Sequence, residues 1–169
     1  MGFKKWVKEK FGLDIPARFI RGGNVVLYHV TSIPPNRNGN ILLHPVKAAK
    51  NVHTYSRKEF EVTSFPRLFF YLDPEDRHKD TVSGEFLYQT TVPASQIYLM
   101  EKDPESFKEK AEVDGHFSFH YYMYLLKRAG YIGGYYNTGL TMGTNHMDVV
   151  ILWVPIKATL VPDAFVRSA

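Results

Sequence analysis

The sequence predicts an α+β fold in which short strands form an antiparallel or mixed sheet with flanking helices. Apolar runs of about four to eight residues recur along the chain and end at Gly, Pro, Asn or Asp, which is typical of strands. Helical patterns are interspersed without the regular alternation that builds a parallel β-α-β sheet. With 169 residues, of which 44% are hydrophobic and 15% aromatic, the chain can bury a core rich in Phe and Tyr.

Charge divides the chain into a basic arm with its linker, residues 1–23, and a single domain, residues 24–169. The first segment holds six basic and two acidic side chains, whereas the other 15 basic and 15 acidic side chains balance. The apolar residues of the arm recur at helical spacing, at Phe3, Trp6, Val7 and Phe11. This predicts an amphipathic helix that packs on its own domain, binds a partner protein through residues 3–11, or lies on a membrane surface.

Several classes of protein are excluded by what the sequence lacks. Without cysteine there are no disulfides, no thiol catalysis and no cysteine-based zinc sites. No apolar run reaches the roughly 20 residues of a membrane-spanning helix, and the N-terminus does not resemble a signal peptide. We therefore expect a cytoplasmic protein with no transmembrane segment. The glycine-rich loops of P-loop and Rossmann proteins and the Gly-x-Ser-x-Gly elbow are also absent.

The first half of the chain is predicted to contain two strands. Its elements are strands at 24–31 and 67–72, a short apolar run at 41–43, a helix at 45–53 and a helix that begins at Asp73. Aromatic residues on both faces of 67–72 indicate a central strand. Asp73 followed by Pro74 and acidic residues is typical of the first turn of a helix.

The second half is predicted to contain strands around one buried helix. Its elements are strands at 85–92, 96–100, 131–136 and 149–154, a helix that begins at Asp103 and a helix at 117–128. The helix at 117–128 is apolar almost all round, so we expect it to be largely buried, with Gly130 ending it. The loop 137–147 is rich in glycine and polar residues.

One histidine pair has the spacing of metal ligands. His116 and His120 lie four residues apart, and Asp114 or His146 could supply a third ligand. However, Phe117 stands where the general-base glutamate of a zinc protease would follow the first histidine. We therefore favour stacking within an aromatic face and predict no metal site.

Residues at the ends of three predicted strands could form a polar site. His29 lies within the first strand, which ends in the hydroxyls of Thr31 and Ser32. Tyr71 lies at the end of a second strand, and Asp148 precedes the last one. An isolated histidine on a strand is commonly a core residue with satisfied hydrogen bonds. Together, however, these side chains could hold a cationic aromatic ring attached to a ribose.

This constellation resembles the ADP-ribosyltransferase superfamily, in particular its His-Tyr-acid branch. The likeness covers residues 24–157 and consists of five short motifs in the family's order. They are residues 28–32 (Tyr-His-Val-Thr-Ser), 68–75 (an aromatic strand running into Asp-Pro-Glu), 86–100 (a strand-Pro-strand segment), 130–133 (Gly-Tyr-Ile-Gly) and 148–157 (the closing strand).

The resemblance implies a split β-sheet fold that binds NAD as a substrate in a cleft. It implies a mono-ADP-ribosyltransferase that releases nicotinamide and passes ADP-ribose to a protein or nucleic-acid acceptor, and an association with phages or toxins. NAD would be held by Tyr28, His29, Thr31, Ser32 and Tyr71. Of these, Tyr71 would stack on nicotinamide and His29 would bind the ribose, while Asp148 would be the catalytic acid.

The chain departs from the family pattern at several positions. Val30 replaces a small residue after the motif histidine, and either Asp148 or Asn137 holds the position of the family's glutamate. The stacking ring could also be Tyr88. The alternative is therefore a non-enzymatic virion or host-interaction protein on a degenerate fold of this type, with residues 3–11 binding the partner. A nucleic-acid binder that uses the arm and exposed tyrosines is a third hypothesis.

Overall fold

The computed structural model describes residues 14–46, 66–79, 84–141 and 146–162, and it confirms the α+β class. Within these residues, most strands join one nine-stranded sheet, in the order β3-β11-β5-β2-β4-β10-β9-β6, with β1 beside β2. All neighbours in this sheet are antiparallel except β6 and β9. The predicted arm, residues 3–11, and most of the predicted helix at 45–53 lie outside the described residues.

The sheet is built from short strands. They are β1 (Ile20–Arg21), β2 (Asn24–Thr31), β3 (Asn40–Leu43), β4 (Leu68–Tyr71), β5 (Phe86–Pro93), β6 (Ile97–Leu99), β9 (Gly133–Asn137), β10 (Asp148–Leu152) and β11 (Ile156–Leu160). A separate hairpin pairs β7 (Glu112–Val113) with β8 (His116–Phe117). The helices are η1 (Ala17–Phe19), η2 (Pro74–Lys79), η3 (Ala94–Gln96), α4 (Phe107–Lys110), α5 (Phe119–Arg128) and α6 (Thr138–Thr141).

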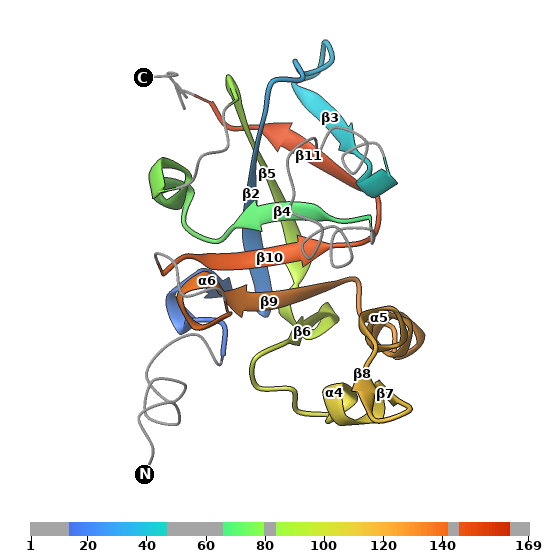
Figure 1. The fold of residues 1–169 in the computed structure, drawn as a ribbon. Helices are drawn as coiled ribbons and strands as arrows, with labels where there is room; N and C mark the ends of the chain where they lie inside the picture. The colour runs from blue at the N-terminus through green and yellow to red at the C-terminus, as the bar shows by residue number, and fades with distance from the viewer. Residues whose placement is uncertain (1–13, 47–65, 80–83, 142–145, 163–169) are drawn as a thin grey trace.

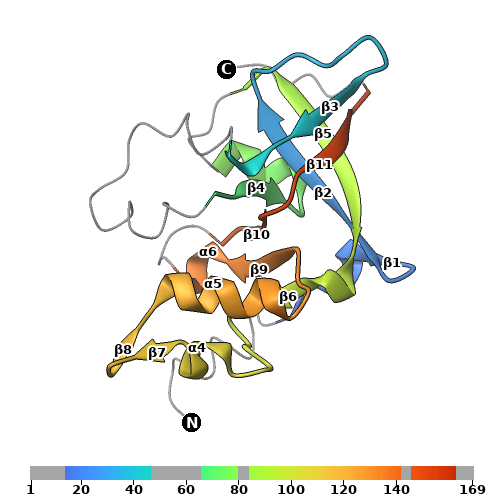
Figure 2. The ribbon, with the colours of Figure 1, turned by 90° about the vertical axis from the view of Figure 1, so that its right-hand side faces the viewer.

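The sheet consists of two halves that meet between β2 and β4. β2 and β5 pair along eight residues, whereas the β2–β4 ladder has the single register pair Tyr28 and Tyr71. Figure 1 shows β2 and β5 running across the direction of β4, β10 and β9, and Figure 2 shows the same crossing from the side. The short β2–β4 ladder therefore lets the chain turn one half-sheet against the other while keeping them hydrogen-bonded.

The two faces of the sheet bury different clusters. On β10, Val150 and Leu152 point into a cluster that collects side chains from both half-sheets, which we call the inner face. Val149 and Ile151 alternate with them and point to the opposite, helix-covered face. There they pack in one cluster with Tyr122 and other buried residues of α4 and α5. β10 is thus buried on both sides, as its run of apolar residues predicts.

The helix α5 differs from its prediction in where it begins and in how far it is buried. It begins at Phe119, because Ser118 caps it by accepting a hydrogen bond from the backbone N–H of Tyr121 at 3.2 Å. The expectation that this helix is buried nearly all round is wrong. Tyr121 and Tyr124 are 41% and 51% exposed, since only one side of α5 meets the sheet.

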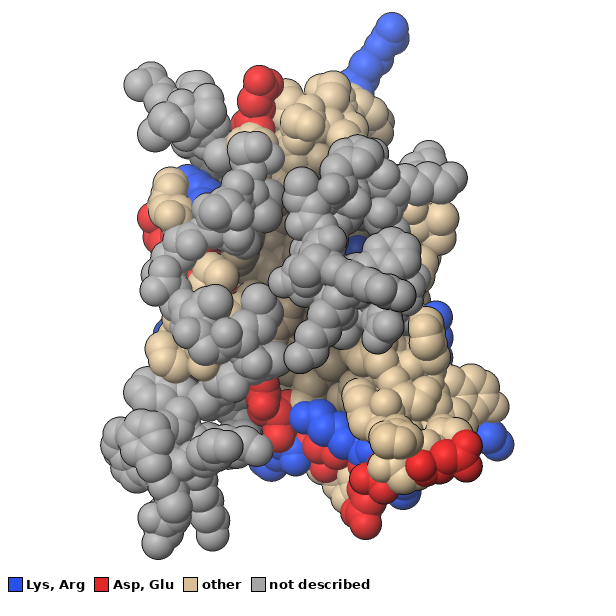
Figure 3. Space-filling model, viewed as in Figure 1, with Lys and Arg blue, Asp and Glu red and all other residues tan. Residues whose placement is uncertain are grey.

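Charged side chains gather at one end of the molecule. Figure 3 shows acidic and basic residues interleaved at the lower end, where Figure 1 places α4, β7 and β8. The carboxylate of Asp103 caps α4 by accepting from the N–H groups of Phe107 at 2.9 Å and Lys108 at 3.1 Å. The helix predicted to begin at Asp103 therefore begins four residues later, at Phe107.

Gly133 allows β9 to approach β10 closely, and its substitution should destabilise the fold. A methyl group at this position would overlap the backbone oxygen of Ile151 and the side chain of Leu152. We expect Gly133→Ala to lower the free energy of unfolding in urea by at least about 2 kcal/mol. Thr91→Ala, at an exposed position of β5, is the matched control and should change it little. Equal stability of the two variants would contradict the proposed close approach.

Candidate functional site

Asp148 is the centre of a partly buried polar cluster on the inner face. It is the first residue of β10 and pairs across the ladder with Asn137, the last residue of β9. Its Oδ1 atom accepts hydrogen bonds from the Tyr135 hydroxyl at 2.6 Å and from Asn137 Nδ2 at 3.3 Å. The side chain of Asp148 is 14% exposed. The cluster therefore holds a carboxylate in a fixed position close to the surface.

Asn137 orients this cluster through its amide oxygen. Oδ1 accepts from the backbone N–H of Gly139 at 3.0 Å and lies 2.9 Å from Nδ1 of His146. Because the amide oxygen is occupied by these donors, the amide nitrogen points to Asp148. The two residues that the sequence offered for the acidic position thus lie side by side, with Asn137 supporting the carboxylate of Asp148.

Arg18 places a positive charge near Asp148, and Tyr135 places a neutral hydroxyl beside it. Arg18 Nη2 lies 4.0 Å from Oδ2 of Asp148, and its guanidinium stacks over the Phe19 ring at 4.4 Å from the centroid. Burial, reinforced by the hydrogen bond to Asp148, raises the pKa of the Tyr135 hydroxyl. Tyr135 therefore stays a neutral donor, and Oδ2 is the oxygen of Asp148 that faces outward toward an exposed cation.

His29 is held as a neutral imidazole with a defined tautomer. Its Nδ1 atom lies 2.6 Å from the backbone oxygen of Phe69, so Nδ1 carries the proton and donates it. Burial lowers the pKa of His29, and the bond to Phe69 offsets part of that effect. The ring contacts that of Phe70 with centroids 5.2 Å apart. Nε2 is consequently left with a lone pair that can accept a hydrogen bond.

His29 and Asp148 lie on the same face of the sheet. His29 contacts Phe70 and Asp148 binds Tyr135, and both rings belong to the inner cluster. In the sheet, β4 lies between β2, which carries His29, and β10, which carries Asp148. Asp148 lies beside Leu72 of the chain after β4, and its backbone oxygen accepts a hydrogen bond from the N–H of Leu72 at 3.2 Å. Strand spacing and rise then put the two backbones roughly 12 Å apart. The same face also carries the buried side chains of Leu27, Phe70 and Leu72.

Tyr71 and Tyr28 do not join this pair. They oppose each other across the β2–β4 ladder, and Tyr71 is buried in the cluster of the helix-covered face. Because neighbouring residues on a strand point to opposite faces, Tyr28 and His29 cannot share a face. The structure therefore does not bring Tyr71 to His29 and Asp148. Tyr88, the alternative ring, is on the inner face beside His29 but is fully buried, and its hydroxyl donates to the Ile33 oxygen at 2.7 Å.

The hydroxyls at the end of β2 lie on the far side of His29. Thr31 follows His29 on the same side of the strand, in the direction away from Asp148. Its Oγ1 accepts from the backbone N–H of Ile33 at 3.3 Å, and Ser32 is exposed after the strand ends. The hydroxyls of Thr31 and Ser32 therefore do not lie between His29 and Asp148. They could contact only a part of a ligand that extends past His29.

Sequence reasoning did not identify Arg18, Tyr135 and His146 as parts of the Asp148 cluster. Arg18 was assigned to the linker, and no local pattern connects it to β10. Tyr135 and His146 could have been found only from the register of β9 against β10, which brings them to Asp148. Among the described residues, His116 and His120 form no group of three ligands that could hold a metal ion.

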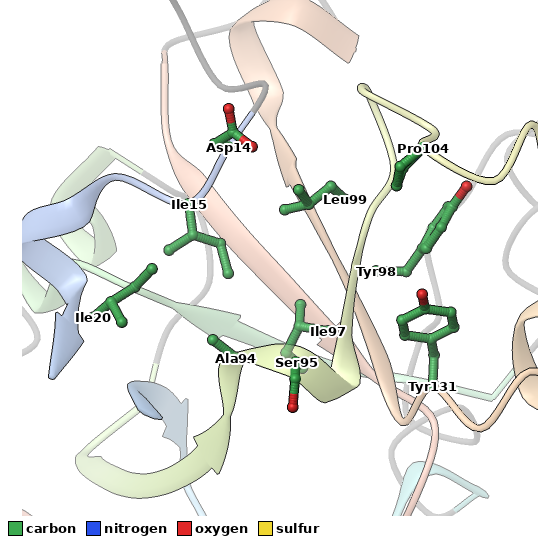
Figure 4. A pocket seen from close by; sticks show the side chains of 10 residues that line it. All are labelled: Asp14, Ile15, Ile20, Ala94, Ser95, Ile97, Tyr98, Leu99, Pro104 and Tyr131. Carbon is green, nitrogen blue, oxygen red and sulfur yellow. The ribbon is translucent and has the colours of Figure 1, made fainter. Parts of the chain in front are cut away.

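A pocket of about 300 Å³ lies apart from His29, at the edge strand β6 (Figure 4). Side chains from the segment before β1, from η3, from β6 and from the loop after it surround the pocket, together with Tyr131. Tyr98 and Tyr131 stand edge to face with centroids 5.0 Å apart. Tyr131 donates to Oε2 of Glu105 at 2.6 Å, so this polar end is already satisfied.

Comparisons with known proteins identify no relative: no family model, no curated protein and no solved structure matches the chain. In the described part of the chain, no helix has the length and apolar character that crossing a bilayer requires.

The partly buried imidazole of His29 predicts a pH dependence of stability. Because the pKa of His29 is lowered in the folded state from its ordinary 6.5, the unfolded chain binds the proton more readily. Stability should therefore fall as the pH drops below about 6.5. We expect His29→Gln to show a smaller fall in urea-unfolding free energy between pH 7 and pH 5, while the exposed His78→Gln keeps the wild-type slope. Identical slopes in all three proteins would contradict the assignment.

Proposed function

We propose that the protein is an NAD-dependent ADP-ribosyltransferase with a macromolecular acceptor, built on the split sheet of that superfamily. The observation that carries this proposal is the placement of His29 and Asp148 on one face, next to the junction of two crossing half-sheets. The order of the sequence motifs supports the same proposal independently. NAD would bind with its nicotinamide ribose in contact with these two side chains.

Asp148 has the chemistry needed to break the bond between ribose and nicotinamide. The electron pair of that bond leaves with nicotinamide, which departs neutral, and positive charge develops on the ribose carbon. A carboxylate fixed by Tyr135 and Asn137 stabilises this charge without having to reorient. The nucleophile of the acceptor then bonds to the ribose carbon and releases its proton to solvent.

His29 would position the ribose. Its Nε2 lone pair accepts a hydrogen bond from a ribose hydroxyl, because Nδ1–H is committed to Phe69 and the lowered pKa keeps the ring neutral. Thr31 and Ser32 would contact the part of NAD that extends past His29. The stacking role predicted for Tyr71 is not part of this proposal, since Tyr71 packs on the other face.

A second candidate function, binding of a macromolecular partner without catalysis, is favoured by the outer side of α5. Tyr121 and Tyr124 are exposed there and stack with an interplanar angle of 18°. Arg128 extends this row, with Nη1 3.5 Å from the Tyr124 hydroxyl. Exposed aromatic rings of this kind mark contact surfaces for other molecules. In the transferase, the same surface would contact the acceptor.

Label transfer from NAD tests the catalytic proposal. The protein incubated with cell extract and NAD labelled in its adenine half should transfer label and slowly hydrolyse NAD. Asp148→Asn should lower both rates at least about 100-fold, because the charge that stabilises the transition state is removed. His29→Gln should weaken NAD binding, and Tyr71→Phe, on the opposite face, should retain activity. Wild-type protein that neither hydrolyses NAD nor binds it in calorimetry would refute the proposal.

The exposed rings of Tyr121 and Tyr124 on α5 predict that transfer of ADP-ribose to the acceptor can be lost while hydrolysis of NAD is kept. The double variant Tyr121→Ala/Tyr124→Ala should keep NAD hydrolysis, since these rings lie on the exposed side of α5, but should lose most transfer to the acceptor. Tyr121→Phe/Tyr124→Phe keeps the ring faces and should retain transfer. Loss of hydrolysis in the alanine variant would show that these rings support the fold or the site instead of the acceptor.

A further inference from the structure

We propose that the pocket beside β6 is the docking site for residues 3–11 of the same chain. This proposal does not depend on the transferase activity. Three observations point to this occupant: the apolar lining of the pocket, the place of Asp14, the first described residue, in its wall, and the acidic residues near the pocket beside the lysines of the segment.

The pocket is lined mainly by apolar side chains and is large enough for aromatic rings. Ile20, Ile97, Leu99 and Pro104 form much of its wall, and the ring of Tyr131 closes one side (Figure 4). A cavity of about 150 Å³ holds one benzene ring, so a volume of about 300 Å³ has room for about two. Ile20 is 37% exposed, so filling the pocket would remove apolar surface from water.

The segment before the first described residue begins at the pocket itself. Asp14 lines the pocket, and its Oδ1 atom is anchored by Lys102 Nζ at 2.8 Å. Ile15, the next residue, is buried in the inner cluster. Phe11 is three residues from Asp14, and three residues span at most about 10 Å. The aromatic residues of the arm are therefore tethered within reach, which raises their local concentration at the pocket.

The segment is basic, and acidic residues stand near the pocket. Residues 3–11 contain four lysines and a single glutamate beside their apolar face. Asp14 lines the pocket and is paired with Lys102. The lining residue Pro104 stands between Asp103 and Glu105 in the chain, and Arg21 follows the lining residue Ile20. An amphipathic helix of this composition can place its rings in the pocket while its lysines face the nearby acidic residues.

A spin-label experiment on the full chain tests the proposal. The chain contains no cysteine, so a nitroxide attached through Ser95→Cys labels only the pocket, whose lining includes Ser95. The two tryptophans, Trp6 and Trp153, are replaced by 5-fluorotryptophan, and Trp6→Phe assigns their fluorine signals. We expect the Trp6 signal to be strongly broadened by the label at position 95. A label attached through Asn38→Cys, in the exposed turn between β2 and β3, should not broaden it.

A charge placed in the pocket provides the matched comparison. Ile20→Lys should release the arm and restore a sharp Trp6 signal, whereas Ile33→Lys, at another exposed isoleucine outside the pocket, should not. An unchanged Trp153 signal shows that the fold is intact, because Trp153 is buried and donates to the Tyr131 oxygen. A Trp6 signal that stays sharp with the label at 95 would overturn the proposal. The proposal would also be overturned if the Trp6 signal were broadened only when the nitroxide at position 95 is carried by another copy of the chain. That result would show that the arm of one copy binds the pocket of another.

Discussion

The burial of β10 on both faces is the constraint on which the arrangement of the site depends. Each of its residues must point either into the inner cluster or into the cluster under α5, and the alternation is strict. Which residues of β10 point to the inner face therefore determines which residues of the neighbouring strands β4 and β9 point there as well. Asp148 falls on the inner side together with His29, and Tyr71 falls on the other side with Val149. A shift of one residue in any of these ladders would exchange the two sets.

Much of the fold follows from local patterns, whereas the choice of face does not. The apolar runs at 24–31 and 149–154 predicted β2 and β10 to within two residues, and Ser118 and Gly130 bound α5 as cap residues do. For β4, however, the sequence presents aromatic residues on both faces, so its pattern does not say which face is inner. Tyr71 was therefore assigned to the site by its position at the strand end. Only pairing with β2 and β10, a long-range contact, determines its direction.

The Asp148 cluster illustrates the same limit for polar residues. The sequence offered Asp148 or Asn137 for one acidic position, since each lies at the end of a strand. The register of β9 against β10 makes them partners: one oxygen of the carboxylate accepts from the amide, and the amide oxygen is held by Gly139 and His146. An isolated carboxylate here would be costly to keep charged in a partly buried place. The supporting donors make a fixed charge compatible with the fold.

The segment from Asp14 to Arg21 connects the two surfaces for which functions are proposed. Asp14 forms a wall of the pocket, Ile15 is anchored in the inner cluster, and Arg18 lies against Asp148 four residues after Asp14. The turn between them is held by the bond from Phe19 N–H to the Pro16 oxygen at 2.9 Å, and β1 then pairs with β2. The packed body therefore begins before the point at which the charge of the sequence changes. Because this segment is fixed at both ends, the exposed side chain of Arg18 remains within reach of Oδ2 of Asp148, so a ligand of that carboxylate would bind with a cation nearby.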